Sequence, residues 1–418
     1  MCQHPPDGPN GHTNHTPHKR ARREDTMAQS LKQAADFILH SKAHSDLKVP
    51  GVVAMATDKN ANIYEGAAGR RSLDSDLAMT TDTVMCIFSC TKSITGVTLM
   101  QLVEEGKVKL SDPAKNYVPD IASIQVLEGF DERGQPRTRA PKSDITLNQL
   151  MLHTAGFGYD FFSNDVLKYI TVKNIPGMVS GTKAALHTPL AFDPGEGWQY
   201  GSNIDWVGQV VEAVRGKRLD AVMKEHIFQQ LGMSETSFII TPDMKRRLSK
   251  IHQRDGSGAL TPTEFVLPQD SEVQNGGHGL YSTIGDYMKY IRMILNDGAG
   301  PNGRVLKAET VHAMAKDGLN GRKITMVPTS IPSLSNDAEF FPGMPKSWGY
   351  TFMINDEKAP TGRSAGSLAW AGLANLYYWI DKSKGVGGMW GTQLFPFADA
   401  TSVGGYLEFE TAVYNSLQ

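Results

Sequence analysis

The sequence is poor in cysteine: Cys2, Cys86 and Cys90 are the only three among 418 residues. An odd and widely spaced set of this kind supports no disulfide framework. Cys86 and Cys90 flank Ser89 in a segment expected to be buried. We therefore interpret both as small core residues rather than as redox or metal-binding groups.

Long hydrophobic runs and an excess of charge of one sign are also missing. No apolar stretch approaches the ~18 residues that a spanning helix needs, and the formal net charge is −2. We therefore expect no membrane partner and no nucleic-acid partner. The absence of an apolar leader favours a cytoplasmic location. The composition, 40% hydrophobic and 21% charged, is that of a soluble protein with one large or two medium domains.

Residues 1–26 differ in composition from the rest of the chain. They hold four histidines and the basic run Lys19-Arg20-Ala21-Arg22-Arg23. Functional interpretations are a nuclear-localisation-like patch or a weak metal-binding tail. The segment has almost nothing apolar to bury, so we predict a disordered N-terminal extension.

The apolar periodicity of the remaining chain predicts an α+β fold. One antiparallel sheet is built from both chain ends and flanked by helices, and a mostly helical domain is inserted between. Residues 27–110 and 216–418 form the α/β domain, and residues 111–215 form the helical domain. The expected helices are 28–44, one from Ser89 to Gly106, 144–152, 204–214, 284–295 and 400–417. The expected strands are 52–56, 63–67, 348–354, 367–370, 376–380 and 386–394, the first two forming a hairpin.

A serine–lysine pair spaced S-x-x-K is the first catalytic signal. It occurs at Ser89–Lys92 and also from Ser45 and from Ser180. The match at Ser45 lies just before Pro50, and the match at Ser180 has no apolar face. Only Ser89 opens a long apolar helical pattern, in which residues i and i+3 share a face. The alternative, a helix-capping serine with the lysine in solvent, conflicts with the apolar neighbours of Lys92.

A second serine signal is the G-x-S-x-G at Gly362–Gly366, centred on Ser364. The nucleophile-elbow mechanism of that pattern needs a histidine later in the chain. The last histidine is His312. We therefore interpret this motif as a chance match.

Serine needs a positioned base to act as a nucleophile. Lys92 can serve if burial lowers its pKa, and a helix N-terminus at Ser89 would favour an oxyanion. Tyr200, in a glycine-rich loop, is a candidate proton relay, although a tyrosine beside Trp198 is more often part of a core. This chemistry calls for no cofactor and no metal ion.

These residues and three further segments resemble the serine β-lactamase superfamily. Ser89-Cys90-Thr91-Lys92 resembles the S-x-x-K of class C β-lactamases, penicillin-binding DD-peptidases and family VIII carboxylesterases. The further segments are Ile145–Gly156, Tyr200–Asn203 and Gly276–Thr283. The resemblance implies that Ser89 is the acylated nucleophile, Lys92 its base and Tyr200 a proton relay. It also implies an oxyanion hole formed by the backbone N–H groups of Ser89 and Leu373.

One departure from the superfamily bears on the substrate. Trp370-Ala371-Gly372 stands where β-lactamases and DD-peptidases carry K-T-G, and it resembles the W-x-G of family VIII esterases. An indole cannot replace an ammonium as an anchor for a carboxylate, which favours neutral esters. Val126–Asp131 also resembles a branch of fungal acyltransferases that acylate statin precursors. The expected substrate-binding residues are Trp370, Gly372, Phe157, Tyr159 and Asn203, with Phe161 and Phe162 lining an apolar pocket.

The leading hypothesis is a serine carboxylesterase that hydrolyses small-molecule, short-chain or aromatic esters through an acyl-enzyme on Ser89. The alternatives are an acyltransferase with a bulky alcohol acceptor, and a β-lactamase or DD-peptidase. An inactive binding protein is a further alternative, which the joint presence of Ser89, Lys92 and Tyr200 disfavours.

Overall fold

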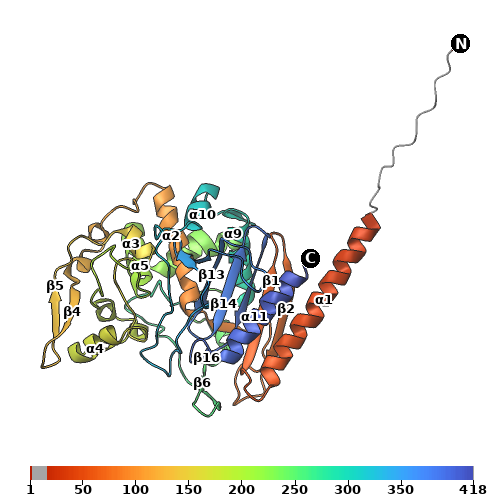
Figure 1. Cartoon of the computed structure of the whole chain (residues 1–418), viewed down its shortest axis with the longest axis horizontal. Coiled ribbons are helices and arrows are strands. Elements are labelled where there is room, and N and C mark those ends of the chain that lie inside the picture. Colours follow the sequence, from red (N-terminus) through yellow and green to blue (C-terminus); the bar gives the residue numbers. More distant parts are fainter. Residues whose placement is uncertain (2–16, 418) are drawn as a thin grey trace.

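Strands from both ends of the chain meet in one seven-stranded antiparallel sheet (Figure 1). The structure is a computed structural model and describes Met1 and residues 17–417. β1 pairs with β15, Met55 lying opposite Met389, and so joins the two halves of the chain. This topology confirms the predicted α+β fold. The strand order is β11 (Lys346–Trp348), β12 (Met353–Asn355), β13 (Ser367–Gly372), β14 (Leu376–Asp381), β15 (Val386–Gly391), β1 (Gly51–Thr57), β2 (Asn62–Gly69).

Helices cover both faces of this sheet. Along β15 successive side chains point to opposite faces, and the strand contacts a different helix on each. Gly387 and Gly391 face α9 (Ile284–Leu295), whereas Trp390 faces α11 (Ala400–Asn415), where its indole N–H donates to Ser402. α1 (Pro17–His44) packs beside α11 (Figure 1).

α1 follows the predicted amphipathic pattern. Its buried residues, Leu31, Ala35, Leu39 and Ala43, recur every four positions and form one apolar stripe. The helix begins at Pro17, earlier than predicted, so its first turns overlap the segment predicted to be disordered. The remainder of that segment, residues 2–16, lies outside the described residues.

The final third departs from the predicted strands at two places. Residues 348–354, expected as one strand, hold the end of β11, a tight turn and the start of β12. The turn places Thr351 at φ 71°, a left-handed conformation outside the range of regular β-strands. Residues 386–394 are likewise divided, between β15 and the short β16 (Leu394–Phe395).

A region with helices lies between the two parts of the sheet, as predicted, although loops make up much of it. It contains α3 (Leu147–Met151), α4 (Asn164–Lys173) and α5 (Asn203–Arg215). Thr146 begins α3 with a reciprocal capping box to Gln149. The sequence did not predict the hairpin β4 (Val126–Phe130) and β5 (Pro136–Arg139), whose turn is held by the Asp131 carboxylate.

Among residues 17–417, no helix is both long and apolar enough to cross a membrane.

The remaining helices and the small sheets complete the fold. The helices not yet described are α2 (Thr91–Glu104), α6 (Leu219–Met223), α7 (Gln229–Leu231), α8 (Pro242–Arg247) and α10 (Ala308–Met314). The small sheets pair β3 (Val84–Cys86) with β8 (Tyr281–Thr283), β9 (Ala299–Gly300) with β10 (Gly303–Arg304), and β6 (His252–Arg254) with β7 (Leu260–Pro262) and β16.

A buried ion pair fastens the loop between β12 and β13 to α11. The Arg363 guanidinium donates to both carboxylate oxygens of Glu410 and to the Tyr406 hydroxyl, and both charged side chains are buried. A buried charge without its partner carries a large desolvation penalty. The pair therefore makes the position of this loop depend on the last helix of the chain.

Glu410→Ala should lower the free energy of unfolding by about 3–5 kcal/mol, because it leaves the Arg363 charge buried and unpaired. The matched control is Glu408→Ala on the same helix. It breaks an ion pair between partly exposed Glu408 and Lys42, which should cost about 1 kcal/mol or less. Urea unfolding followed by tryptophan fluorescence measures both. Equal losses in the two variants would contradict the role given to the buried pair.

Candidate active site

Ser89 lies in a single 3-10 turn, Phe88–Cys90, between β3 and α2. It is partly exposed, while the residues around it from Thr83 to Leu102 are buried. The preceding residue, Phe88, has φ 42°, a left-handed conformation that is strained for a bulky side chain. Packing of its ring against Phe265 and Phe395 holds it there. The turn thus exposes the Ser89 hydroxyl within a segment that is otherwise buried.

Lys92, in the first turn of α2, has its amine next to Ser89. Nζ lies 3.0 Å from Ser89 Oγ, 2.9 Å from the Tyr159 hydroxyl and 2.8 Å from the Gly277 carbonyl oxygen. The side chain is fully buried, and this burial lowers its pKa to about 7, although the Asp205 charge acts in the opposite direction. The neutral amine is therefore well populated near neutral pH.

The partners of Lys92 decide how the neutral amine is oriented. The Tyr159 hydroxyl donates to Asp205 Oδ2, so its oxygen accepts from Lys92. The Gly277 carbonyl can only accept. A neutral amine has two N–H donors and one lone pair. With both donors so used, the lone pair faces Ser89 Oγ and can take its proton.

Asp205, in the first turn of α5, supports this arrangement from behind. Its carboxylate also accepts from the Gly277 backbone N–H at 2.9 Å and lies 3.4 Å from His278 Nδ1. Burial acts to raise the pKa of Asp205, but His278, Lys92 and the Gly277 N–H outweigh it and leave the pKa below its usual value. A Cβ at Gly277 would lie 2.4 Å from this carboxylate, which explains the glycine.

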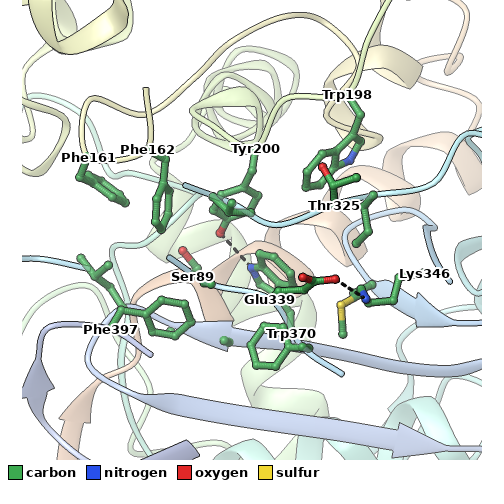
Figure 2. Close-up of a pocket in the computed structure, with 18 residues that line it drawn as sticks. Ser89, Phe161, Phe162, Trp198, Tyr200, Thr325, Glu339, Lys346, Trp370 and Phe397 are labelled. Atoms are coloured by element: carbon green, nitrogen blue, oxygen red, sulfur yellow. Dashed lines mark hydrogen bonds and ion pairs between the residues drawn. The ribbon is translucent and has the colours of Figure 1, made fainter. Parts of the chain in front are cut away.

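Tyr200 stands on the other side of Ser89. The Trp370 indole N–H donates to its hydroxyl oxygen at 2.9 Å (Figure 2). The Tyr200 ring centroid lies 4.7 Å from Lys92 Nζ. Burial raises the pKa of Tyr200, while hydrogen bonds with Ser89 and Trp370 act to lower it. The hydroxyl therefore keeps its proton at neutral pH, as a proton donor to a leaving group must.

The end of β13 lies against the Ser89 turn. A Cβ at Gly372 would sit 2.4 Å from the Ile87 carbonyl oxygen, so only glycine permits this approach. Ser89 and Leu373 then line the same cavity. This proximity is compatible with the predicted oxyanion hole, whose two backbone donors come from these residues.

Ser89 opens into an apolar cavity (Figure 2). Including its open mouth, the empty space between the lining atoms measures about 550 Å³. Ser89 also borders a smaller cavity of about 250 Å³, which Tyr159 and His278 line. The larger cavity is lined by Ser89, Phe161, Phe162, Trp198, Tyr200, Ile324, Thr325, Val327, Ala338, Glu339, Phe340, Lys346, Met353, Trp370, Ala371, Gly372, Leu373 and Phe397.

Two residues expected to bind substrate lie elsewhere. Phe157 is fully buried and packs on Trp206, away from both cavities. Asn203 is also buried, and its amide donates to His153 Nδ1 and to the Phe157 carbonyl oxygen. Because these contacts stay within the protein, Asn203 shapes the loop that carries Tyr200 rather than contacting substrate.

Ser364 lies in the loop between β12 and β13. Its N–H donates to Asp381 and its carbonyl accepts from Asn355. These backbone bonds give it a structural place in the loop. It lines neither of the cavities that Ser89 borders.

Sequence reasoning missed three features of the site. Asp205 had a signal, since an acidic residue within the apolar run from Ile204 to Val207 needs a buried partner. His278 lay inside a glycine-rich motif already recognised. The cavity wall between residues 324 and 346 could not be predicted, because its apolar residues do not recur at the spacing of a helix or a strand. In the described part of the chain, no three His, Cys, Asp or Glu side chains gather as metal ligands would.

The family model described as Beta-lactamase matches residues 25–412. Two curated relatives are similar over most of their length. Monacolin J acid methylbutanoyltransferase of Aspergillus terreus is 30% identical over 393 residues, covering 90% of this chain and 94% of the relative. Lovastatin esterase of Penicillium rubens is 29% identical over 363 residues, covering 82% and 88%.

Solved structures show the same fold. A mutant of simvastatin synthase (LovD) from Aspergillus terreus superposes with a TM-score of 0.78 at 27% identity, over 96% of this chain and 97% of that one. EstCE1, a hydrolase with promiscuous acyltransferase activity, has a TM-score of 0.70 at 18% identity, over 95% and 100%. At that identity the second likeness concerns the fold alone.

Ser89→Ala should abolish hydrolysis of p-nitrophenyl acetate, whereas Ser364→Ala should keep most of it. Lys92→Ala and Tyr200→Phe should each lose at least about 100-fold in kcat, the size of a lost general base or acid. Release of p-nitrophenol measures all four variants. If only Ser364→Ala lost activity, the nucleophile would be Ser364 and the assignment of Ser89 would be wrong.

The pH dependence of kcat/KM should report Lys92. Burial moves its pKa below the usual value to about 7, so the base is charged and inactive below that pH and neutral above it. The rate should therefore rise through about pH 7 and then level off. Asp205→Asn removes a charge that raises this pKa and should move the rise to lower pH. A rise that stays unmoved in this variant would contradict the assignment.

Proposed function

The chain belongs to the beta-lactamase family of serine enzymes, and from this premise we propose that it transfers an acyl group from an ester to a bulky, largely apolar alcohol. The acyl group is carried on Ser89. Hydrolysis is the same reaction with water as the acceptor.

The observation that carries the proposal is the apolar cavity beside Ser89. Aromatic and aliphatic side chains make up most of its wall. Trp370 occupies the place of the K-T-G lysine, and its single N–H is taken by Tyr200. No cation is therefore presented at that place to hold a substrate carboxylate. This supports neutral acyl donors over β-lactams and peptides.

The relatives support acyl transfer to a bulky acceptor. The similarity to monacolin J acid methylbutanoyltransferase, named for a transfer to monacolin J acid, covers nine-tenths of this chain. The wall of the larger cavity beside Ser89 is mostly apolar, which suits an acceptor with an apolar body. An alcohol seated in an apolar cavity is favoured over water because its apolar surface is removed from solvent.

The proposed reaction has two steps that mirror each other. The lone pair of Lys92 takes the Ser89 proton while Oγ attacks the donor carbonyl carbon. The tetrahedral oxyanion collapses, the leaving alkoxide receives a proton through Tyr200, and the acyl-enzyme remains. An acceptor hydroxyl then attacks the same carbonyl carbon, its proton passes back, and the Ser89 Oγ–carbonyl bond breaks. In the first step the proton of Ser89 leaves on the departing alcohol, and in the second step Ser89 regains a proton from the acceptor hydroxyl.

A carboxylesterase is the second candidate, because the lovastatin esterase matches four-fifths of this chain. Both candidates share the acyl-enzyme and differ only in what attacks it. Membership of the family VIII esterase branch and a cytoplasmic location stay predictions.

Adding cyclohexylmethanol to the enzyme and p-nitrophenyl butyrate should divert the acyl group into cyclohexylmethyl butyrate. Transfer should exceed hydrolysis at millimolar alcohol, because the apolar acceptor binds and bulk water does not. Gas chromatography quantifies ester and acid, with Ser89→Ala as the blank. Free butyrate as the sole product at every alcohol concentration would instead establish the esterase. Turnover of nitrocefin at a comparable rate would contradict both.

A further inference from the structure

Among the described residues that line the larger cavity, only Glu339 and Lys346 carry a charge. Both lie at the edge of the sheet, Glu339 in the segment before β11 and Lys346 at its first position. The remaining wall is apolar apart from a few neutral polar groups. A charge in such a wall strongly affects which ligands can enter, because interactions between charges strengthen where water is excluded.

The ammonium group of Lys346 finds all its hydrogen-bond partners within the protein. Its side chain is 3% exposed, and Nζ donates to the backbone carbonyls of Met344 at 2.7 Å and Phe341 at 3.2 Å and to Glu339 Oε1 at 3.3 Å. An ammonium has three N–H donors, and each has an acceptor here. Lys346 therefore pins the segment from Glu339 to Met344 and has no donor left for a ligand.

Glu339 is not saturated in this way. Its side chain is 29% exposed, and its one hydrogen-bond partner among the described residues is Lys346. A carboxylate offers about four acceptor positions, so most of this capacity is not used by the protein. Figure 2 shows the carboxylate extending into the cavity, with Ser89 on one side and Lys346 on the other.

We propose that Glu339 binds a hydrogen-bond donor on the alcohol half of the substrate, either a second hydroxyl or an ammonium, and disfavours a carboxylate there. The inference deepens the proposed function, since it assumes that an alcohol occupies this cavity during formation or breakdown of acyl-Ser89. The preferred acceptors are thus diols and amino alcohols with an apolar body.

The physical reason is the asymmetry of the charged pair. A donor on the substrate meets open carboxylate oxygens and forms a charge-assisted hydrogen bond. A substrate carboxylate meets the Glu339 charge, while the compensating Lys346 ammonium is enclosed by backbone carbonyls. Because Lys346 fixes the segment, Glu339 holds its place without a ligand, and binding orders no further side chain.

The inference is tested with four cyclohexylmethanols that differ only at the far ring carbon, which bears methyl, hydroxymethyl, aminomethyl or carboxylate. Each serves as acceptor with p-nitrophenyl butyrate, and kcat and KM for the acceptor are measured separately. Each is also supplied as its butyrate ester and hydrolysed, which tests the same cavity without transfer. In the wild type, KM should be lowest for aminomethyl and hydroxymethyl and highest for carboxylate.

Glu339→Gln keeps the size of the side chain and removes its charge. It should raise KM for the aminomethyl compound roughly tenfold and lower KM for the carboxylate compound, with little change for methyl. Glu339→Asp keeps the charge and should preserve the wild-type order. The control is Glu357→Gln, at an exposed glutamate that lines none of the described cavities.

The outcomes separate the inference from the function on which it rests. Shifts of opposite sign for the ammonium and carboxylate compounds support a binding role for Glu339. Shifts of equal sign for all four compounds mean that Glu339 only stabilises the segment, and they overturn the inference. Wild-type enzyme that neither transfers to nor hydrolyses any of the four overturns the proposed function itself.

Discussion

The enclosure of the Lys92 amine is the constraint on which the rest of the site depends. A buried lysine is tolerated only if its polar atoms are satisfied, and here three different segments supply the partners. The Ser89 turn, the loop of Tyr159 and the glycine-rich turn at Gly277 must therefore meet at one point. Asp205 extends the requirement to α5. One amine thus fixes the relative positions of the two parts of the fold.

Trp370 stands beside Tyr200 without adding a charge, and this sets the electrostatics of the site. Trp370 donates its only N–H to Tyr200, so it orients the tyrosine without adding charge. The charges nearest Ser89 are buried in the Lys92–Asp205 network behind it. The cavity wall contributes Glu339 and an enclosed Lys346. The space offered to a substrate is therefore apolar, with acceptor capacity concentrated at one carboxylate.

Much of this could be predicted from the sequence, and the failures have physical causes. The Ser89 helix has a long apolar run, and the motifs around Tyr200 and Gly276 are specific in combination. The hairpin β4–β5 was not predicted, because its strands are short and mostly not buried and so lack a run of alternating apolar residues. Phe157 was predicted to line the pocket because it is aromatic and near Tyr159, but adjacent aromatics can face different interiors. The wall around Glu339 depends on contacts between distant segments, which no local pattern records.

The pairing of β1 with β15 has a consequence for biosynthesis. Met55 lies opposite Met389, so the ribosome must complete almost the whole chain before the first hairpin acquires its central neighbour. Contacts so distant in sequence slow folding, because a long loop must close before they form. Until then the apolar strand β1 has one unpaired edge, which is a template for mispairing with other chains. The nascent protein therefore has an extended period in which protection by a chaperone matters more than the stability of its finished fold.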